Sequence, residues 1–110
     1  IAANLKNGIA ALTNAADWIL AQYDSAPAAV HAGSVPFLKL TGIVVGGWLM
    51  AKSAAIAVKH IGAGTTDNFY SAKLATATYF AAHQLPFAAA YAAEITGGAD
   101  SVFGLPENLF

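Results

Sequence analysis

Apolar residues recur at helical spacing along most of the chain and predict three long helices. The first runs from about Asn4 to Tyr23. Its large apolar side chains follow one another every three or four positions and form a narrow stripe: Leu5, Ile9, Leu12, Ala16, Ile19 and Tyr23. Trp18 lies away from this stripe among polar neighbours. We therefore expect the stripe to face the core. Trp18 is expected either to fold over its own helix or to contact another domain or subunit.

The second predicted helix runs from Ser34 to about Ile61. A connector rich in small residues, 24–34, precedes it, and Gly62-Ala63-Gly64 ends it. Ser34 is the expected N-cap and Pro36 lies in the first turn.

Apolar side chains surround this helix nearly completely, which predicts burial on several faces. One side carries Leu40, Ile43, Val44, Val58 and Ile61; the opposite side carries Leu38, Val45, Leu49 and Ile56, with Phe37 and Trp48 between them. The remaining strip of Gly42, Gly46, Ser53 and His60 would let another helix come close.

The third predicted helix starts at Thr66 or Asp67, one of which caps it, and runs to about Thr96 before Gly97-Gly98. One face carries Phe69, Thr76, Phe80, Phe87 and Tyr91, and another carries Leu74, Ala81 and Leu85. Pro86 must kink or break this helix, because it has no N–H and crowds the preceding turn. Residues 99–110 indicate a short helical turn followed by an apolar tail.

No alternating pattern predicts a strand. The expected fold is therefore all-α, a single domain over residues 1–110. It is an antiparallel up-and-down bundle of three long helices, the third kinked near Pro86, plus a short C-terminal helical turn.

Composition adds one unusual property, a scarcity of charge. The 110 residues include 5 Lys, no Arg and 6 acidic residues, so 10% are charged against a norm of about 25%. A compact chain of this mass exposes roughly 5,700 Å², which so few charges cannot cover, and we expect part of the surface to be covered by other protein. The lack of Arg and a net charge of −1 argue against nucleic-acid binding. The lack of Cys excludes disulfides and thiolate metal sites.

A membrane span is not expected. The longest uncharged run, Leu74–Ala93, is rich in Ala and contains His83 and Pro86. Gly42 and Gly46 match the GxxxG pattern of membrane helices, but Lys39 and Lys52 flank them closely. The chain starts at Ile1 without a basic and apolar leader, so we expect a processed or excerpted chain with no signal peptide.

The residues that could carry chemistry form no recognisable site. His31, His60 and His83 are not spaced as metal ligands. The carboxylates Asp17, Asp24, Asp100 and Glu107 are expected in solvent, and Gly62-Ala63-Gly64 lacks the context of a nucleotide-binding loop. We predict no catalytic, cofactor-binding or metal-binding residue.

Three stretches together do resemble a known family. They are PFLKLTGIVVGGWLMA (36–51), FYSAKLATATYFAAHQLP (69–86) and TGGADSVFGLPENLF (96–110). In order and spacing they resemble the C-terminal-like accessory domain of bacterial acyl-CoA (or acetyl-CoA) dehydrogenases. The resemblance covers most of the chain and is weakest over residues 1–34.

The resemblance implies a parent enzyme that uses FAD to remove hydrogens from Cα and Cβ of an acyl-CoA thioester. In that family the catalytic glutamate and the flavin-binding parts precede this domain, and neither Glu94 nor Glu107 lies in the matching context. The chain is therefore expected to be a C-terminal excerpt of a longer cytoplasmic dehydrogenase, without FAD of its own. Its expected partners are the dehydrogenase core of the same polypeptide and further copies in a homo-oligomer.

Two other interpretations remain open at this point. The chain could be a self-associating helical scaffold or binding module that works alone. A complete small enzyme is disfavoured, because no constellation of catalytic residues supports it.

Overall fold

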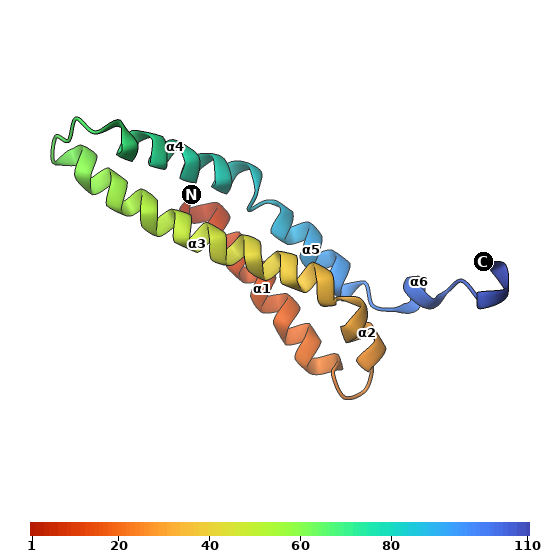
Figure 1. Ribbon diagram of the computed structural model, residues 1–110. Coiled ribbons are helices and arrows are strands. Elements are labelled where there is room, and N and C mark those ends of the chain that lie inside the picture. Colours follow the sequence, from red (N-terminus) through yellow and green to blue (C-terminus); the bar gives the residue numbers. More distant parts are fainter.

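The computed structural model describes residues 1–110, which form helices joined by short turns (Figure 1). The helices are α1 (Ala2–Gln22), α2 (Pro27–Ala32), α3 (Ser34–Gly62), α4 (Asn68–His83), α5 (Phe87–Thr96), α6 (Asp100–Phe103) and the 3₁₀ helix η1 (Glu107–Leu109). The chain contains no strand, which confirms the all-α prediction. The long helix α3 is the spine of the molecule; α1 lies along its first half, and α4 and α5 return along it.

Local sequence signals set most helix ends. The Asp67 carboxylate accepts a hydrogen bond from the Phe69 N–H at 2.9 Å, so Asp67 rather than Thr66 caps α4. The predicted cap of α3 is wrong by one residue. Gly33 is the N-cap, and Ser34 is the first helical residue, whose hydroxyl donates to the His31 carbonyl at 2.8 Å.

The connector predicted over 24–34 contains a helix that the sequence interpretation missed. Pro27 lies at the start of α2, where its missing N–H costs no hydrogen bond and its fixed φ suits the first turn. A proline that ends one helix signal therefore starts the next one here.

Pro86 breaks the third predicted helix into α4 and α5, as predicted. The N–H groups of Gln84 and Leu85 both donate to the Phe80 carbonyl, at 2.9 and 3.1 Å. The Ala81 carbonyl is then left without a backbone donor, and the Asn4 side chain donates to it at 2.9 Å. This bond ties α1 to the break, and it is the one side-chain hydrogen bond that joins distant parts of the chain.

The stripe predicted to bury α1 does not face the core. The buried residues of α1 are Gly8 and Ala15, whereas Ile9 and Tyr23 are 46% and 59% exposed. Trp18 packs against the core of its own chain, contrary to both roles expected for it. The reason is close helix packing: a Cβ at Gly8 would lie only 3.4 Å from side-chain atoms of Leu85 and Val44, which leaves no room for bulkier residues.

One side of α3 is buried and the opposite side is open, so the expected burial on several faces is wrong for the single chain. The buried side carries Pro36, Leu40, Val44, Gly47, Ala54 and Ala57. Leu38, Leu49 and Ile56 on the opposite side are 73%, 51% and 57% exposed.

The glycines of α3 make room for neighbours at two positions. A Cβ at Gly46 would lie 3.1 Å from the Phe80 ring, and one at Gly47 would lie 2.6 Å from a methyl group of Leu85. Gly42, expected to admit a helix, has no atom of this chain within 4 Å of that point.

The core lies in the half of the molecule where α1, α3 and α5 meet. It consists of Ala15, Leu40, Val44, Ala88 and Ile95. Beyond the N-terminus of α1, α3 and α4 continue as a two-helix arm (Figure 1), and the buried side chains there are small alanines such as Ala57 and Ala77. The arm therefore contains no large, fully buried side chain.

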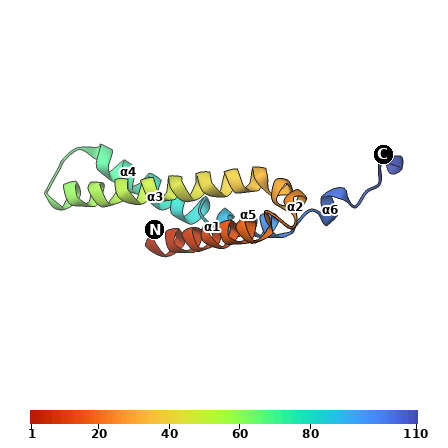
Figure 2. The same ribbon diagram turned by 90° about the horizontal axis from the view of Figure 1, so that it is seen from below.

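The shape is long and flat (Figure 2). The extents are 66 × 30 × 15 Å and the radius of gyration is 18.6 Å, against roughly 13 Å for a compact domain of this length. The C-terminal segment with α6 and η1 extends away from the bundle. The accessible surface is 7157 Å², which exceeds the roughly 5,700 Å² of a compact chain by about a quarter.

Candidate interaction surface

The polar residues considered for chemistry lie far apart in the fold. His31 is in α2, His60 stacks on Tyr70 at the far end of the arm with ring centroids 4.2 Å apart, and His83 lies beside Tyr79 at the end of α4. The carboxylates of Asp17, Asp24, Asp100 and Glu107 are exposed. No group of three or more His, Cys, Asp or Glu side chains is close enough to hold a metal ion.

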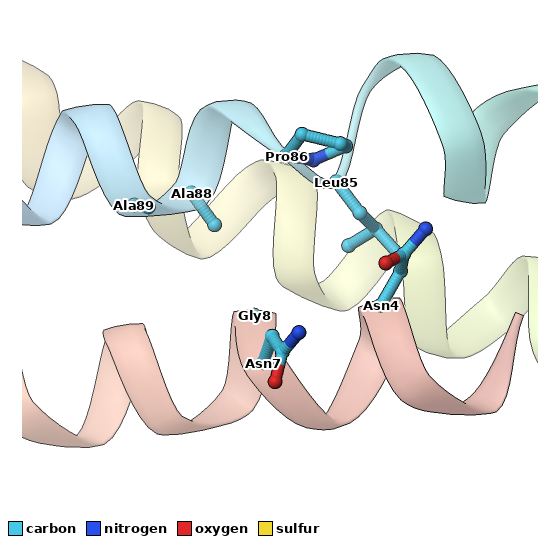
Figure 3. A pocket seen from close by; sticks show the side chains of 7 residues that line it. All are labelled: Asn4, Asn7, Gly8, Leu85, Pro86, Ala88 and Ala89. Carbon is cyan, nitrogen blue, oxygen red and sulfur yellow. The ribbon is translucent and has the colours of Figure 1, made fainter.

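Two small cavities interrupt the helix packing. The first, about 170 Å³, lies where α1 passes the break between α4 and α5 (Figure 3). Its walls are Asn4, Asn7, Gly8, Leu85, Pro86, Ala88 and Ala89. The second, about 180 Å³, lies in the arm between Ile56 and Ala57 of α3 and Phe69, Tyr70 and Lys73 of α4.

Neither cavity fits the FAD that the resemblance implies for the parent enzyme. Pockets for ligands of drug size or larger usually measure about 300–1,000 Å³, well above both volumes. The walls of the first cavity carry two amides and no cation that could face the flavin pyrophosphate. The residues of this chain alone therefore do not form an FAD site.

Exposed apolar surface is the dominant feature of the molecule. Twenty large hydrophobic residues are exposed, whereas 15 residues of any kind are buried. Monomeric proteins rarely leave such surface open over a contiguous patch. The excess over a compact chain, about 1,450 Å², is larger than the ~800 Å² that one partner contributes to a standard protein interface.

The most regular exposed patch follows the outer side of α3. It contains Val35, Leu38, Gly42, Val45, Leu49, Lys52 and Ile56, which we call the α3 seam. These residues are spaced alternately by three and four, the spacing of the two contact positions in a coiled-coil heptad. All seven are exposed, and the five large apolar members range from 44% to 73% exposed.

Trp48 borders the seam, with the Lys52 ammonium 4.6 Å from its ring centroid. Two other apolar areas are open: the α1 stripe, where Leu20 is 76% exposed, and the C-terminal tail, where Phe110 is 91% exposed.

The sequence interpretation found part of the seam and missed the rest. Leu38, Val45, Leu49 and Ile56 were placed on one side of the helix, but Gly42 was assigned to a separate strip of small residues. Val35 and Lys52 were not included. The signal that joins all seven is the three-four spacing, which becomes informative once the opposite side of α3 is known to hold the core.

By length and composition α3 is able to cross a membrane, although 22% of its most apolar stretch is already buried inside the molecule. Core helices of proteins in water pass the same test. The absence of a membrane span stays a prediction.

These features define an all-α packing module with an incomplete surface. The chain belongs to the acetyl-CoA dehydrogenase C-terminal-like family, which it matches over residues 1–106. It is 38% identical over 102 residues to a 3-methylmercaptopropionyl-CoA dehydrogenase of Ruegeria pomeroyi. That match covers 93% of this chain and 17% of the relative.

A broad-specificity linear acyl-CoA dehydrogenase of Mycobacterium tuberculosis is 43% identical over 60 residues, which cover 52% of this chain and 10% of that protein. The chain thus spans at most about a sixth of the length of these relatives.

Proposed function

We propose that this chain is a non-catalytic helical module of an FAD-dependent acyl-CoA dehydrogenase and serves to pack its core and its neighbouring subunit. The observation that carries the proposal is the open apolar surface, about 1,450 Å² more than a compact chain would expose. A module whose exposed side chains contact other parts of an assembly needs few charges, which agrees with a charged fraction of 10%.

The chemistry of the proposed enzyme is α,β-dehydrogenation of an acyl-CoA thioester by residues outside this chain. When bound there, FAD takes the hydride from Cβ. The relatives, both named as acyl-CoA dehydrogenases, are about six to ten times longer than the region matched here. We further propose that the enzyme is bacterial and cytoplasmic. An independent scaffold is less well supported, because both relatives carry this region within a much longer chain.

Flavin binding is the first test. The chain is mixed with FAD, desalted and examined for flavin absorbance. We expect no retained flavin, since neither cavity has the size for it. Retention of one flavin per chain would contradict the non-catalytic role.

Packing is tested in the Ruegeria relative. This chain replaces the matched region of that dehydrogenase, and a second variant lacks the region. If the region serves packing, the chimera retains FAD and acyl-CoA oxidation, whereas the deletion variant aggregates or loses its native oligomeric mass. A deletion variant with the mass and stability of the intact enzyme would refute the packing role.

A further inference from the structure

We infer that the α3 seam is the contact face for a second copy of this chain, with the two α3 helices antiparallel and related by a two-fold axis near Gly47. The inference rests on the proposed packing role and names the partner and the register. It draws on the seam's spacing, its pairing with itself and the distribution of its charge.

The seam is complementary to itself in this orientation. With the axis at Gly47, Val45 faces the second copy's Leu49 and Leu38 faces the second copy's Ile56. Each pair occurs twice, as a two-fold interface requires. Residues at heptad spacing pack as knobs into holes when helices cross at roughly 20°.

The same register pairs Gly42 with the second copy's Lys52. Gly42 has no neighbour within its own chain, so the missing Cβ leaves space along which the four-carbon stem of a lysine can lie. This pairing accommodates the one charged residue of the seam and accounts for the one glycine in it.

Charge separation favours antiparallel over parallel helices. α3 carries Lys39, Lys52 and Lys59 and no acidic residue. In a parallel pair the two Lys52 side chains would face each other. In the antiparallel pair they are ten helical residues apart, about 15 Å along the axis, which exceeds the Debye length of roughly 8 Å at physiological ionic strength.

The open surface is large enough for this contact. The surface in excess of a compact chain, about 1,450 Å², exceeds what a standard interface takes from one partner. The seam lies opposite the core side of α3, and a second copy can therefore bind without displacing α1, α4 or α5.

Light scattering on the chain tests the contact. At micromolar concentration we expect about twice the chain mass of 11.2 kDa. Leu49→Glu should give monomers with unchanged helical circular dichroism, because Leu49 is already exposed in the single chain. The matched control is Leu20→Glu on α1, which should remain dimeric. A monomeric wild-type chain at every concentration overturns the inference.

Cysteine cross-linking tests the register, and the chain offers a cysteine-free background. The double variant Gly42→Cys/Lys52→Cys cannot form a disulfide within one chain, because the two Cα atoms are about 15 Å apart on one helix. In the antiparallel register it should form covalent dimers on oxidation. Each single variant should stay uncross-linked, as should the control pair Lys6→Cys/Leu20→Cys.

Efficient cross-linking of either single variant would indicate a different register and refute the assignment. A seam that binds the dehydrogenase core would give monomers, no cross-linking and a Ruegeria chimera that still assembles. In that case the inference fails while the packing role stands.

Discussion

The packing of Leu85 against two glycines gives a sharp test of how the helices approach one another. Gly8 of α1 and Gly47 of α3 are both buried, and both face the side chain of Leu85, which is 2% exposed. In the helix interior an alanine is more favourable than a glycine by roughly 0.5–1 kcal/mol. Replacing each glycine by alanine therefore adds the same helix propensity at two sites that differ in available space.

The structure predicts opposite outcomes for the two substitutions. At Gly8 the new methyl group would lie 3.4 Å from Leu85 and Val44, an ordinary contact, so Gly8→Ala should stabilise the chain by about 0.5–1 kcal/mol. At Gly47 it would lie 2.6 Å from one Leu85 methyl group and 3.0 Å from the other and from Cγ. Overpacking of this kind costs about 1–3 kcal/mol, so Gly47→Ala should destabilise the chain by roughly 0.5–2 kcal/mol.

Thermal and urea unfolding followed by circular dichroism at one protein concentration measure the difference. A change of 1 kcal/mol moves the Tm of a chain this size by about 4–8 °C. In a Leu85→Ala background the clash is absent, and Gly47→Ala should become neutral or stabilising. The reasoning is refuted if Gly47→Ala is as stable as Gly8→Ala, or if the Leu85→Ala background leaves its effect unchanged.

Three further substitutions test the other local claims. Asn4→Ala should destabilise the chain by about 1–3 kcal/mol, because it leaves the half-buried Ala81 carbonyl without a donor. Asp67→Ala should cost about 0.5–2 kcal/mol by removing the cap on the Phe69 N–H. Ile95→Ala should cost about 2–5 kcal/mol, since Ile95 is 1% exposed in the core. Urea unfolding measures all three.

Each of these has a matched control. Asn7→Ala, at the wall of the same cavity, should be nearly neutral. Asp67→Asn should retain most of the cap, because an amide oxygen also accepts the bond. Leu20→Ala, at a side chain 76% exposed, should change stability by less than about 0.5 kcal/mol. Equal losses in a variant and its control would contradict the assigned contact.

Features that depend on neighbouring residues were predictable from the sequence. The bounds of α3, the Asp67 cap and the break at Pro86 follow from hydrogen-bonding rules that act within one turn. The face of α1 was not predictable in this way. A ranking by side-chain hydrophobicity assigns Ile9 and Tyr23 to the core, whereas the helices approach through Gly8 and Ala15.

The same limit applies to the interaction surface. The sequence indicates that α3 is apolar on two sides, but it does not say which side the chain covers by itself. That choice depends on the close contact of Gly47 with Leu85, a residue 38 positions further along the chain. The α3 seam is recognisable as a seam only after this contact places the core on the other side.

The arm described earlier has a consequence for how the chain opens. The first half of α3 is held by Leu40 and Val44 in a three-helix core, while the far half and α4 share mainly buried alanines. Segments with little buried apolar volume exchange their amide hydrogens through local opening rather than global unfolding. A single uninterrupted helix should thus belong to two cooperative units, with amides near Leu40 protected longest and those near Ala57 exchanging far sooner. The boundary between them should fall where the N-terminus of α1 stops.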